Sequence, residues 1–326
     1  MGVRWGVLGA GSVAQRRVMP AMNDNPQCEI GALMVRDLGR AEKLAESFGV
    51  ERCYDRVDAL LDDPDVDAIY VSSPVYLHCE HVLAAAERGR HVLCEKPMAA
   101  SSDECRKMIA ACKATGVHLE VCFVLRGWPI YHRVKAMMDS GQLGQMVELR
   151  AHLAKRTPRS EDEWRLDPGK GGGGILIDVG AHYLDLFRYL AGDFAKIAYM
   201  GSSQAFGWAV EDSAFVTVSF QSGAHGVLGI SCAVPHSGNL LEVYGTEGTL
   251  LLGKELTVVT DKGEETQPTA FPDYYSGLLA HFCRCVAEGG EPMASGTDGL
   301  RNLEAIETAY RSEREGRILE VACADT

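Results

Sequence analysis

The sequence lacks features that would mark a membrane protein or a nucleic-acid-binding protein. No apolar run approaches the roughly 20 residues that a membrane-spanning helix needs. Basic residues are in the minority, with 32 Lys and Arg against 45 Asp and Glu, which gives a net charge of −13. An acidic surface repels the phosphates of nucleic acids. We therefore expect a protein that binds neither membranes nor nucleic acids.

Signals for export and for metal binding are also missing. The first residues lack the basic region and the long apolar region of a signal peptide. The 11 cysteines are scattered and form no Cys-x-x-Cys pair, and the run from His78 to His81 offers too few ligands for zinc. Cys283 and Cys285 point in different directions on a predicted helix, which disfavours a redox pair. We expect a cytoplasmic protein with reduced thiols and no metal.

The first 125 of the 326 residues alternate between short apolar strands and helices. Strands are predicted at 3–8, 29–35, 67–71, 91–95 and 117–124, and helices from about residue 12 and over 40–48, 80–88 and 102–115. Such alternation with short connections is typical of a doubly wound parallel α/β sheet, the Rossmann fold. We assign residues 1–125 to an N-terminal domain of this class.

The pattern changes after residue 125. Helices are predicted at 130–139, 175–190, 274–288 and 299–315, and strands at 146–154, 214–220, 225–231, 240–244, 249–252 and 256–259. Consecutive strands with tight turns, such as the turn from Gly245 to Gly248, indicate a largely antiparallel sheet. We assign residues 126–326 to an α+β domain.

A glycine-rich turn directly follows the first predicted strand. The run Gly9-Ala10-Gly11-Ser12-Val13-Ala14 fits the pattern G-x-G-x-x-G/A. The first glycine permits the tight turn, the second lets a pyrophosphate approach the backbone, and the small third residue allows close packing of helix on strand. The alternative is an ordinary strand–turn–helix. Its place at the start of a strand–helix series favours dinucleotide binding.

The end of the second strand discriminates between the two nicotinamide cofactors. An acidic residue there holds the ribose 2′-hydroxyl of NAD, whereas an arginine nearby accommodates the 2′-phosphate of NADP. The sequence has Val35 where the acid is expected, followed by Arg36. This favours NADP(H). NAD(H) remains the alternative, with Asp37 as the ribose ligand and Arg36 as a surface charge.

Lys96 lies at the carboxyl end of a predicted strand, in the run Glu95-Lys96-Pro97. Open α/β sheets bind ligands at this edge, where a lysine can donate hydrogen bonds to a substrate oxygen. Pro97 forces an abrupt change of direction, for which a cis bond is one route. The alternative is an exposed lysine without a role, and Lys96 alone does not decide between them.

Asp178 and His182 follow a run of four glycines, Gly171–Gly174. Their spacing places a carboxylate and an imidazole on one helix face. A histidine takes up and returns protons near neutral pH, and an aspartate can orient it. The alternative is a pair that only stabilises the helix.

Taken together and in this order, these motifs resemble the glucose–fructose oxidoreductase, inositol dehydrogenase and rhizopine-catabolism family, Gfo/Idh/MocA, over essentially the whole chain. The resemblance also includes Ser73-Pro74 with His78, Arg126 with Pro129, Trp164-Arg165 and the turn from Gly245 to Gly248. It implies a Rossmann domain followed by an open-faced sheet that makes a homodimer or homotetramer interface.

The resemblance implies a role for each site residue. His182 is the general acid/base, Lys96 positions the reacting oxygen, and Asp178 contacts substrate or tunes the pair. With Arg126, these residues form the expected substrate site. The expected cofactor-binding residues are Gly9, Ala10, Gly11, Ser12, Val13, Arg36, Ser72, Ser73, Pro74, Leu77, His78, Glu95, Lys96, Trp164 and Arg165.

The implied activity is reversible hydride transfer between a nicotinamide and a sugar, polyol or related keto or hydroxy compound. Two alternatives remain: an NAD-dependent inositol-type dehydrogenase, and a non-catalytic NAD(P)-binding sensor on the same fold. Lys96, Asp178 and His182 together favour the enzyme, because a sensor needs no acid/base group.

Overall fold

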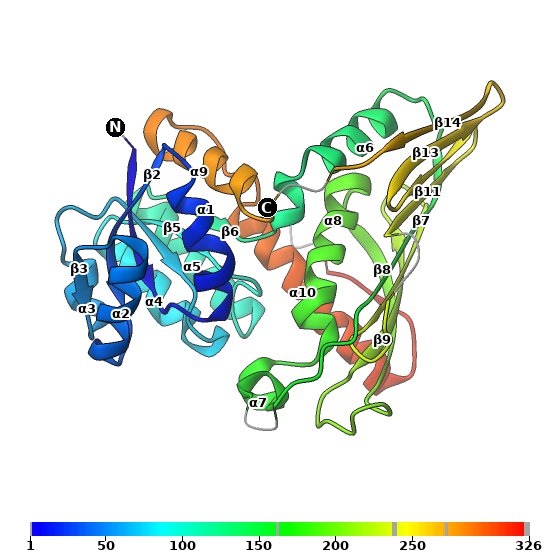
Figure 1. Cartoon of the computed structure of the whole chain (residues 1–326). Helices are drawn as coiled ribbons and strands as arrows, with labels where there is room; N and C mark the ends of the chain where they lie inside the picture. The colour runs from blue at the N-terminus through cyan, green and yellow to red at the C-terminus, as the bar shows by residue number, and fades with distance from the viewer. Residues whose placement is uncertain (1, 161–162, 237–239, 271–272, 323–326) are drawn as a thin grey trace. The chain divides into compact units, whose positions relative to one another are not determined.

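A computed structural model describes residues 2–160, 163–236, 240–270 and 273–322 (Figure 1). The chain forms two compact units. The first contains Met1–Trp128 and Pro272–Arg301, and the second contains Pro129–Phe271 and Asn302–Thr326. Each unit is described separately below.

The first unit contains a six-stranded sheet. Its strands are β1 (Val3–Leu8), β2 (Cys28–Met34), β3 (Arg52–Tyr54), β4 (Ala68–Val71), β5 (His91–Cys94) and β6 (Leu119–Val121). They lie in the order β3-β2-β1-β4-β5-β6, and every pair is parallel. This is the strand order of the dinucleotide-binding Rossmann fold, with the crevice expected where the order reverses between β1 and β4. The predicted fold class is confirmed.

Helices connect these strands, and the sequence explains where several of them begin and end. They are a π-helical turn (Ala14–Val18), α1 (Met19–Asn23), α2 (Leu38–Phe48), α3 (Val57–Leu61), α4 (His78–Glu87), α5 (Ser102–Thr115) and α9 (Ser276–Glu288). The side chain of Asp37 accepts a hydrogen bond from the Arg40 amide at the start of α2, and Gly49 ends that helix in the left-handed conformation.

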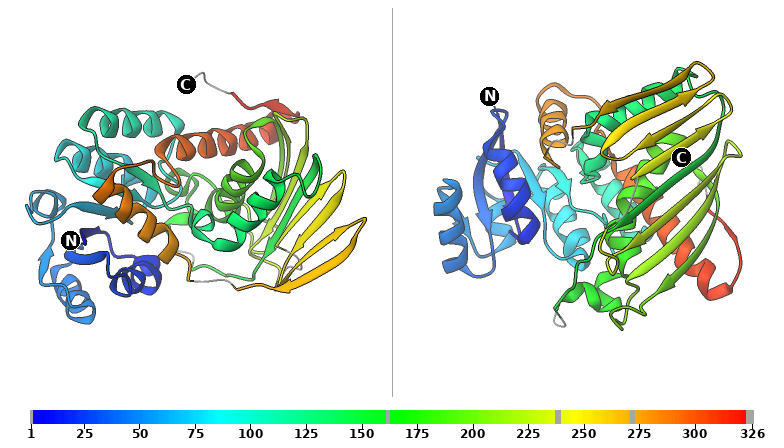
Figure 2. Two further views of the ribbon diagram at one scale, coloured as in Figure 1. Left: turned by 90° about the horizontal axis from the view of Figure 1, so that it is seen from above. Right: turned by 45° about the vertical axis from the view of Figure 1, so that its right-hand side comes forward.

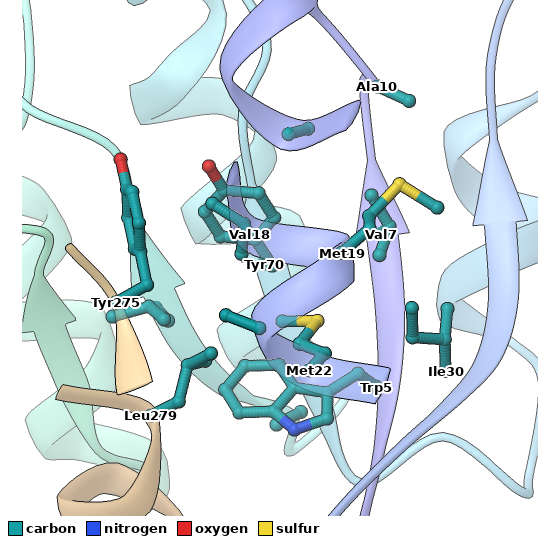
Figure 3. Close-up of a cluster of buried hydrophobic side chains, with 14 of the residues drawn as sticks. Trp5, Val7, Ala10, Val18, Met19, Met22, Ile30, Tyr70, Tyr275 and Leu279 are labelled. Atoms are coloured by element: carbon teal, nitrogen blue, oxygen red, sulfur yellow. The ribbon is translucent and has the colours of Figure 1, made fainter. Parts of the chain in front are cut away.

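A segment from late in the chain completes the core of the first unit. Trp5 on β1 is fully buried, and its ring lies 5.4 Å from that of Phe282 on α9. Figure 3 shows Leu279 beside Trp5 and Met22, and Tyr275 farther along on the side of Tyr70. Because α9 covers apolar surface of β1 and α1, residues 272–301 pack with the first unit. This packing differs from the single division expected at residue 125.

The second unit contains a nine-stranded mixed sheet. Its strands are β7 (Met146–Ala154), β8 (Phe194–Ser202), β9 (Ser213–Phe220), β10 (His225–Ser231), β11 (Leu241–Gly245), β12 (Gly248–Leu252), β13 (Glu255–Thr260), β14 (Gly263–Pro268) and β15 (Leu319–Glu320). The order is β14-β13-β12-β11-β7-β10-β9-β8-β15. Only β7 and β10 pair in parallel among these strands. The predicted, largely antiparallel sheet is confirmed.

Helices cover one face of this sheet and leave the other face open (Figure 2). The helices are α6 (Pro129–Asp139), α7 (Pro168–Gly171), α8 (Ala181–Ala191) and α10 (Gly296–Glu315), of which α10 begins in the first unit. On β9, buried Ala214, Val216 and Val218 alternate with exposed side chains. The open face carries Met200 and Phe215, each at least half exposed.

Some elements differ from the predictions. The strand expected at 117–124 is only β6, and a 3-10 turn follows at Val124–Gly127. The elements α3, β3, β8, β14 and β15 were not expected. In β14 nearly every residue is exposed, so no apolar alternation marks it as a strand. No helix of the described residues is both long enough and apolar enough to cross a membrane.

Candidate cofactor and active site

The glycine turn after β1 is shaped to let a ligand approach the backbone. Gly9 has φ +82°, and a Cβ atom there would lie 3.0 Å from the Ser73 amide nitrogen. At Gly11 the nearest atom to such a Cβ would be 3.9 Å away, so the space beside it is open. Ala14 is fully buried against the core. The helix that begins at Ser12 directs its free amides toward this space, which fits a pyrophosphate.

The end of β2 presents two arginines, and the only acid between them, Asp37, caps the next helix. Val35 is buried, whereas Arg36 and Arg40 are exposed. The Arg40 guanidinium donates a hydrogen bond to the Ala10 carbonyl (2.8 Å), which places it beside the glycine turn. Asp37, the alternative ribose ligand, accepts the Arg40 amide as a helix cap. Arg40 was not predicted, because it lies six residues beyond Met34, the last residue of β2.

The loop after β4 contacts the glycine turn directly. Ser72 Oγ donates a hydrogen bond to the Gly9 carbonyl, and Ser73 Oγ lies 2.9 Å from His81 Nδ1. His78 is 1% exposed, and its two ring nitrogens lie 2.8 Å from the Ser73 carbonyl and 3.1 Å from the Pro97 carbonyl. Burial lowers the pKa of His78. The imidazole therefore holds the ends of β4 and β5 in place.

Pro74 and Leu77 complete this loop. Pro74 precedes a single 3-10 turn, Val75–Leu77, and both Pro74 and Leu77 are partly exposed. Val13, on the other side of the glycine turn, is 40% exposed. All three have surface available for contact with a ligand.

Glu95 fixes the backbone that carries Lys96. Its Oε1 accepts hydrogen bonds from the hydroxyls of Tyr70 (2.8 Å) and Tyr275 (2.9 Å), and its Oε2 accepts from the Lys96 amide (3.2 Å). Burial, and then the Glu95 charge, raises the pKa of both tyrosines, which keeps them protonated as donors. The Lys96–Pro97 peptide is cis, as the sequence suggested. Lys96 itself is partly exposed at the carboxyl edge.

Arg126 lies in the 3-10 turn after β6 and is fixed by contacts with the late-sequence segment of the first unit. It is 6% exposed, and its guanidinium donates to the Met293 carbonyl (2.9 Å) and to Asp298 Oδ1 (2.8 Å). Asp298 in turn accepts from the amide and hydroxyl of Ser295 (both 2.9 Å). The sequence analysis missed Asp298, because a contact between residues 172 positions apart leaves no local pattern.

In the second unit, the glycine run lets the start of a helix pack directly against the side chain of Glu211. The carboxylate of Glu211 accepts from the amides of Gly174 (2.9 Å) and Leu176 (3.1 Å) and from the Tyr310 hydroxyl (2.8 Å). A Cβ at Gly173 would collide with Tyr310, and one at Gly174 with Glu211. The glycines therefore allow a close approach that sets where the next helix begins.

Asp178 and His182 lie on that helix, which opens with a π-helical turn. The π-turn covers Leu176–Gly180, and α8 continues from Ala181. Both side chains are partly exposed. Asp178 is paired with Arg159, whose guanidinium donates to Asp178 Oδ2. Both residues therefore lie on the predicted helix, and an unpredicted arginine is paired with Asp178.

Arg159 belongs to a group of four charged side chains. It is 13% exposed and donates to Glu163 Oε1 (2.8 Å) as well as to Asp178. Arg165 Nη1 donates to the same Glu163 oxygen (3.0 Å), and its Nε lies 4.0 Å from Asp178. The Arg165 guanidinium stacks over the Trp164 ring, 4.4 Å from its centre. Two cations thus lie beside the Asp178 carboxylate.

The structure therefore gathers the sequence-predicted residues into two groups. In the first unit, the predicted residues follow the carboxyl ends of β1, β2, β4 and β5. They are Gly9–Val13, Arg36, Ser72–Pro74, Leu77, His78, Glu95 and Lys96. The second unit contains the other group, which consists of Trp164, Arg165, Asp178 and His182. Within the described ranges, no group of three or more His, Cys, Asp or Glu side chains is arranged to hold a metal.

Comparisons with known proteins agree with this geometry. Residues 3–123 match the family model described as "Oxidoreductase family, NAD-binding Rossmann fold", and residues 131–251 match the "GFO/IDH/MocA C-terminal domain". A 1,5-anhydro-D-fructose reductase from Ensifer adhaerens is 30% identical, over 98% of this chain and 98% of its own. A D-xylose 1-dehydrogenase (NADP(+)) from Haloferax volcanii is 29% identical, over 97% and 99%.

The fold is shared with solved structures over the whole chain. An aldose-aldose oxidoreductase from Caulobacter crescentus, solved with glycerol, has a TM-score of 0.90 at 29% identity, covering 98% of this chain and 100% of that one. The matched family model and these relatives identify the class of the protein as an oxidoreductase with an NAD-binding Rossmann fold. The chain belongs to the Gfo/Idh/MocA family.

Proposed function

We propose that this protein is an NADP(H)-dependent oxidoreductase that interconverts a hydroxyl and a carbonyl group on a sugar, polyol or related compound. The observation that carries this proposal is the second-unit pair, in which Asp178 is paired with Arg159 and His182 lies four residues further along the chain. The relatives support the substrate class, because they are named for a sugar or an anhydrosugar.

The cofactor is proposed to lie along the carboxyl edge of the parallel sheet. Gly9–Ser12 would hold the pyrophosphate, with Val13, Ser72, Ser73, Pro74 and Leu77 along the dinucleotide. His78 and Glu95 would act indirectly by fixing the loops. Trp164 and Arg165 are proposed as the second unit's contribution to cofactor binding. When bound, the nicotinamide ring supplies the hydride chemistry.

The protein's own residues would handle the proton. His182 is proposed to take the hydroxyl proton during oxidation and to return it to the oxygen during reduction. Lys96, whose backbone is fixed by Glu95, is proposed to donate a hydrogen bond to the same oxygen and stabilise its negative charge. Asp178 would favour the protonated imidazole. Arg126, with Asp298 behind it, is proposed to line the substrate site.

We propose NADP(H) as the preferred cofactor because the β2 end offers Arg36 and Arg40 and engages Asp37 as a helix cap. Arg36→Ala is expected to weaken NADPH binding at least about tenfold, since a charge-assisted bidentate contact is lost, while NADH binding stays within about twofold. Equal losses for both cofactors, measured by fluorescence titration, would contradict the assignment. Known relatives include proteins named for either cofactor.

The activity itself can be tested by a substrate screen. Purified protein would be assayed with sugars, polyols, inositols and their keto forms while the absorbance of NADPH and NADH is followed. Turnover with a carbohydrate supports the proposal. Tight cofactor binding without turnover on any compound would instead favour the alternative of a non-catalytic sensor.

The open face of the nine-stranded sheet is proposed to join copies of this chain into a homodimer or homotetramer. Met200 and Phe215 face each other on neighbouring strands, and Phe215 lies across Gly229 toward His152. An apolar surface of this kind is typical of an interface. Phe215→Glu is expected to lower the molar mass seen by light scattering, and an unchanged mass would rule this face out.

A further inference from the structure

Two cysteines that lie 255 positions apart in the sequence meet in the first unit. The Sγ atoms of Cys28, at the start of β2, and Cys283, in the middle of α9, are 3.4 Å apart and share a hydrogen bond. Cys28 is partly exposed, whereas Cys283 is 2% exposed. Cys28 is therefore the more accessible residue of the pair, and the sulfur of the buried Cys283 lies within contact distance of its sulfur.

The surroundings of the pair favour loss of one proton. The hydrogen bond from the Cys28 thiol, followed by smaller contributions from the Trp5 indole N–H and Arg284, lowers the pKa of Cys283 in spite of burial. The same hydrogen bond and burial raise the pKa of Cys28. Trp5 is fully buried, and its indole N–H lowers the pKa of both cysteines.

We propose that Cys28 and Cys283 form a redox-active dithiol in the cofactor-binding unit, which a hydroperoxide converts into a disulfide. The Cys283 sulfur lies within hydrogen-bond distance of the Cys28 thiol, so it can accept the Cys28 proton as the more exposed Cys28 sulfur reacts. Peroxide is a suitable oxidant because it is small enough to reach a partly covered thiolate. In the expected cytoplasmic location the pair is reduced at rest.

The chemistry is balanced by one peroxide molecule. The Cys28 thiolate attacks a peroxide oxygen, the O–O bond breaks, and the leaving hydroxide takes up a proton to become water, which leaves a sulfenic acid. The Cys283 sulfur then attacks the Cys28 sulfur, forms the S–S bond and releases the second water. Two thiols have then lost two hydrogen atoms in total.

Disulfide formation would change the position of groups at the sheet edge that carries Lys96. The two sulfur atoms must approach from 3.4 Å to about 2 Å, which draws α9 toward β2. Tyr275, eight residues or about 12 Å along the chain from Cys283, donates to Glu95, whose other oxygen holds the Lys96 amide. A shift of α9 therefore reaches Glu95 and Lys96 through one hydrogen bond.

The site can be tested by mass spectrometry on the full-length protein. After treatment with hydrogen peroxide and denaturation, the number of alkylated cysteines should fall by two from 11, and peptide mapping should recover a fragment that joins Cys28 to Cys283. Cys28→Ser and Cys283→Ser should abolish the cross-link. The matched control Cys53→Ser, which removes another partly exposed cysteine on the neighbouring strand, should retain it.

Other outcomes would overturn the proposal. A cross-link between different cysteines, or over-oxidation of Cys28 with Cys283 still alkylated, would show that the pair is not the redox site. The mapping on unmodified protein does not depend on whether a variant folds. It also does not depend on turnover, so failure of the proposed enzymatic function would be seen separately.

The coupling to the cofactor site has its own measurement and rests on the proposed function. Oxidation should change the NADPH dissociation constant of the unmodified protein and of Cys53→Ser at least about threefold, and leave that of Cys28→Ser unchanged. A disulfide that forms without any change in affinity would overturn the coupling through Tyr275 and Glu95. Absence of NADPH binding in the reduced protein would count against the proposed function instead.

Discussion

The two units hold their candidate site residues by different means. In the first unit, buried groups fix the backbone: His78 bridges two loops, and Glu95 receives two tyrosine hydroxyls. In the second unit, ion pairs among partly exposed side chains hold Asp178. His78 and Glu95 stand in motifs that directly follow strand ends, whereas Arg159 stands in no motif and lies 19 positions from Asp178. A site of the first kind can therefore be recognised from a sequence motif. For a site of the second kind, the sequence indicates the site residue but not its ion-pair partner.

The largest expected effect is at the second unit's histidine. His182→Ala should lower kcat by about 10²–10⁴-fold, the range supplied by a general acid/base, while the NADPH dissociation constant stays within about twofold. Steady-state kinetics and fluorescence titration measure the two quantities. His225→Ala, an exposed histidine in the same unit, is the matched control. A loss of cofactor binding in His182→Ala would contradict the proposed role.

A second prediction compares two glycines of the first unit. Gly9→Ala places a Cβ 3.0 Å from the Ser73 amide at a φ of +82°, so we expect a lower melting temperature and a loss of NADPH affinity of about tenfold or more. Gly11→Ala meets no atom closer than 3.9 Å and should keep the melting temperature while still weakening NADPH. If both variants melt like the unmodified protein, backbone strain does not set this turn.

The third prediction addresses the ion pairs of the second unit. Arg159→Ala removes a cation beside Asp178, so the pKa of that carboxyl should rise and the acidic limb of the kcat/KM profile should move to higher pH. We expect kcat/KM at neutral pH to fall about tenfold, with partial recovery in Arg159→Lys. Arg156→Ala, an exposed neighbour, is the control. An unmoved pH profile would assign Arg159 a purely structural role.

The smallest effect on turnover is expected at Glu120, in the first unit. Its carboxyl is fully buried, and burial raises its pKa from 4.5 to about 8, although the backbone at Ala294 and Met293 opposes the shift. The folded state keeps a proton that the unfolded chain releases, so the free energy of unfolding should fall by about 1.4 kcal/mol per pH unit between pH 4.5 and 8. The nearby charges are Arg126, which opposes this shift, and Asp298, which adds to it.

Urea unfolding at several pH values tests this slope. Glu120→Gln should remove it and be more stable than the unmodified protein at pH 8, because no carboxyl has to be ionised in the core. Glu29→Gln, on the exposed side of β2, should keep the slope. A slope that persists in Glu120→Gln would mean that another buried group is responsible.

Local patterns were sufficient for the fold class and for the cofactor edge. The helix Ser102–Thr115 and the strands Met146–Ala154 and His225–Ser231 have the predicted bounds, because their apolar periodicity is regular and their ends carry clear signals. The family and the enzyme class were likewise predicted and are confirmed by the comparisons. The individual site residues stay predictions.

Contacts between distant residues could not be predicted. Arg40, Arg159, Glu211 and Asp298 act on site residues through side-chain hydrogen bonds that follow no spacing rule. The sequence also did not indicate the two π-helical turns, one after the glycine turn and one at Asp178. Such turns are often found at functional sites. They depend on tertiary packing, which adds one residue to a helical turn without changing the apolar pattern.

The interleaved path of the chain restricts how this protein can exchange parts with its relatives. Because α9 covers Trp5 on β1, a fragment that ends at Trp128 would expose the face of its sheet that carries Trp5. A single recombination crossover near that residue would separate β1 from its cover. Inheritance of the nucleotide-binding half as a working module therefore requires two crossovers, one on each side of the inserted sheet unit.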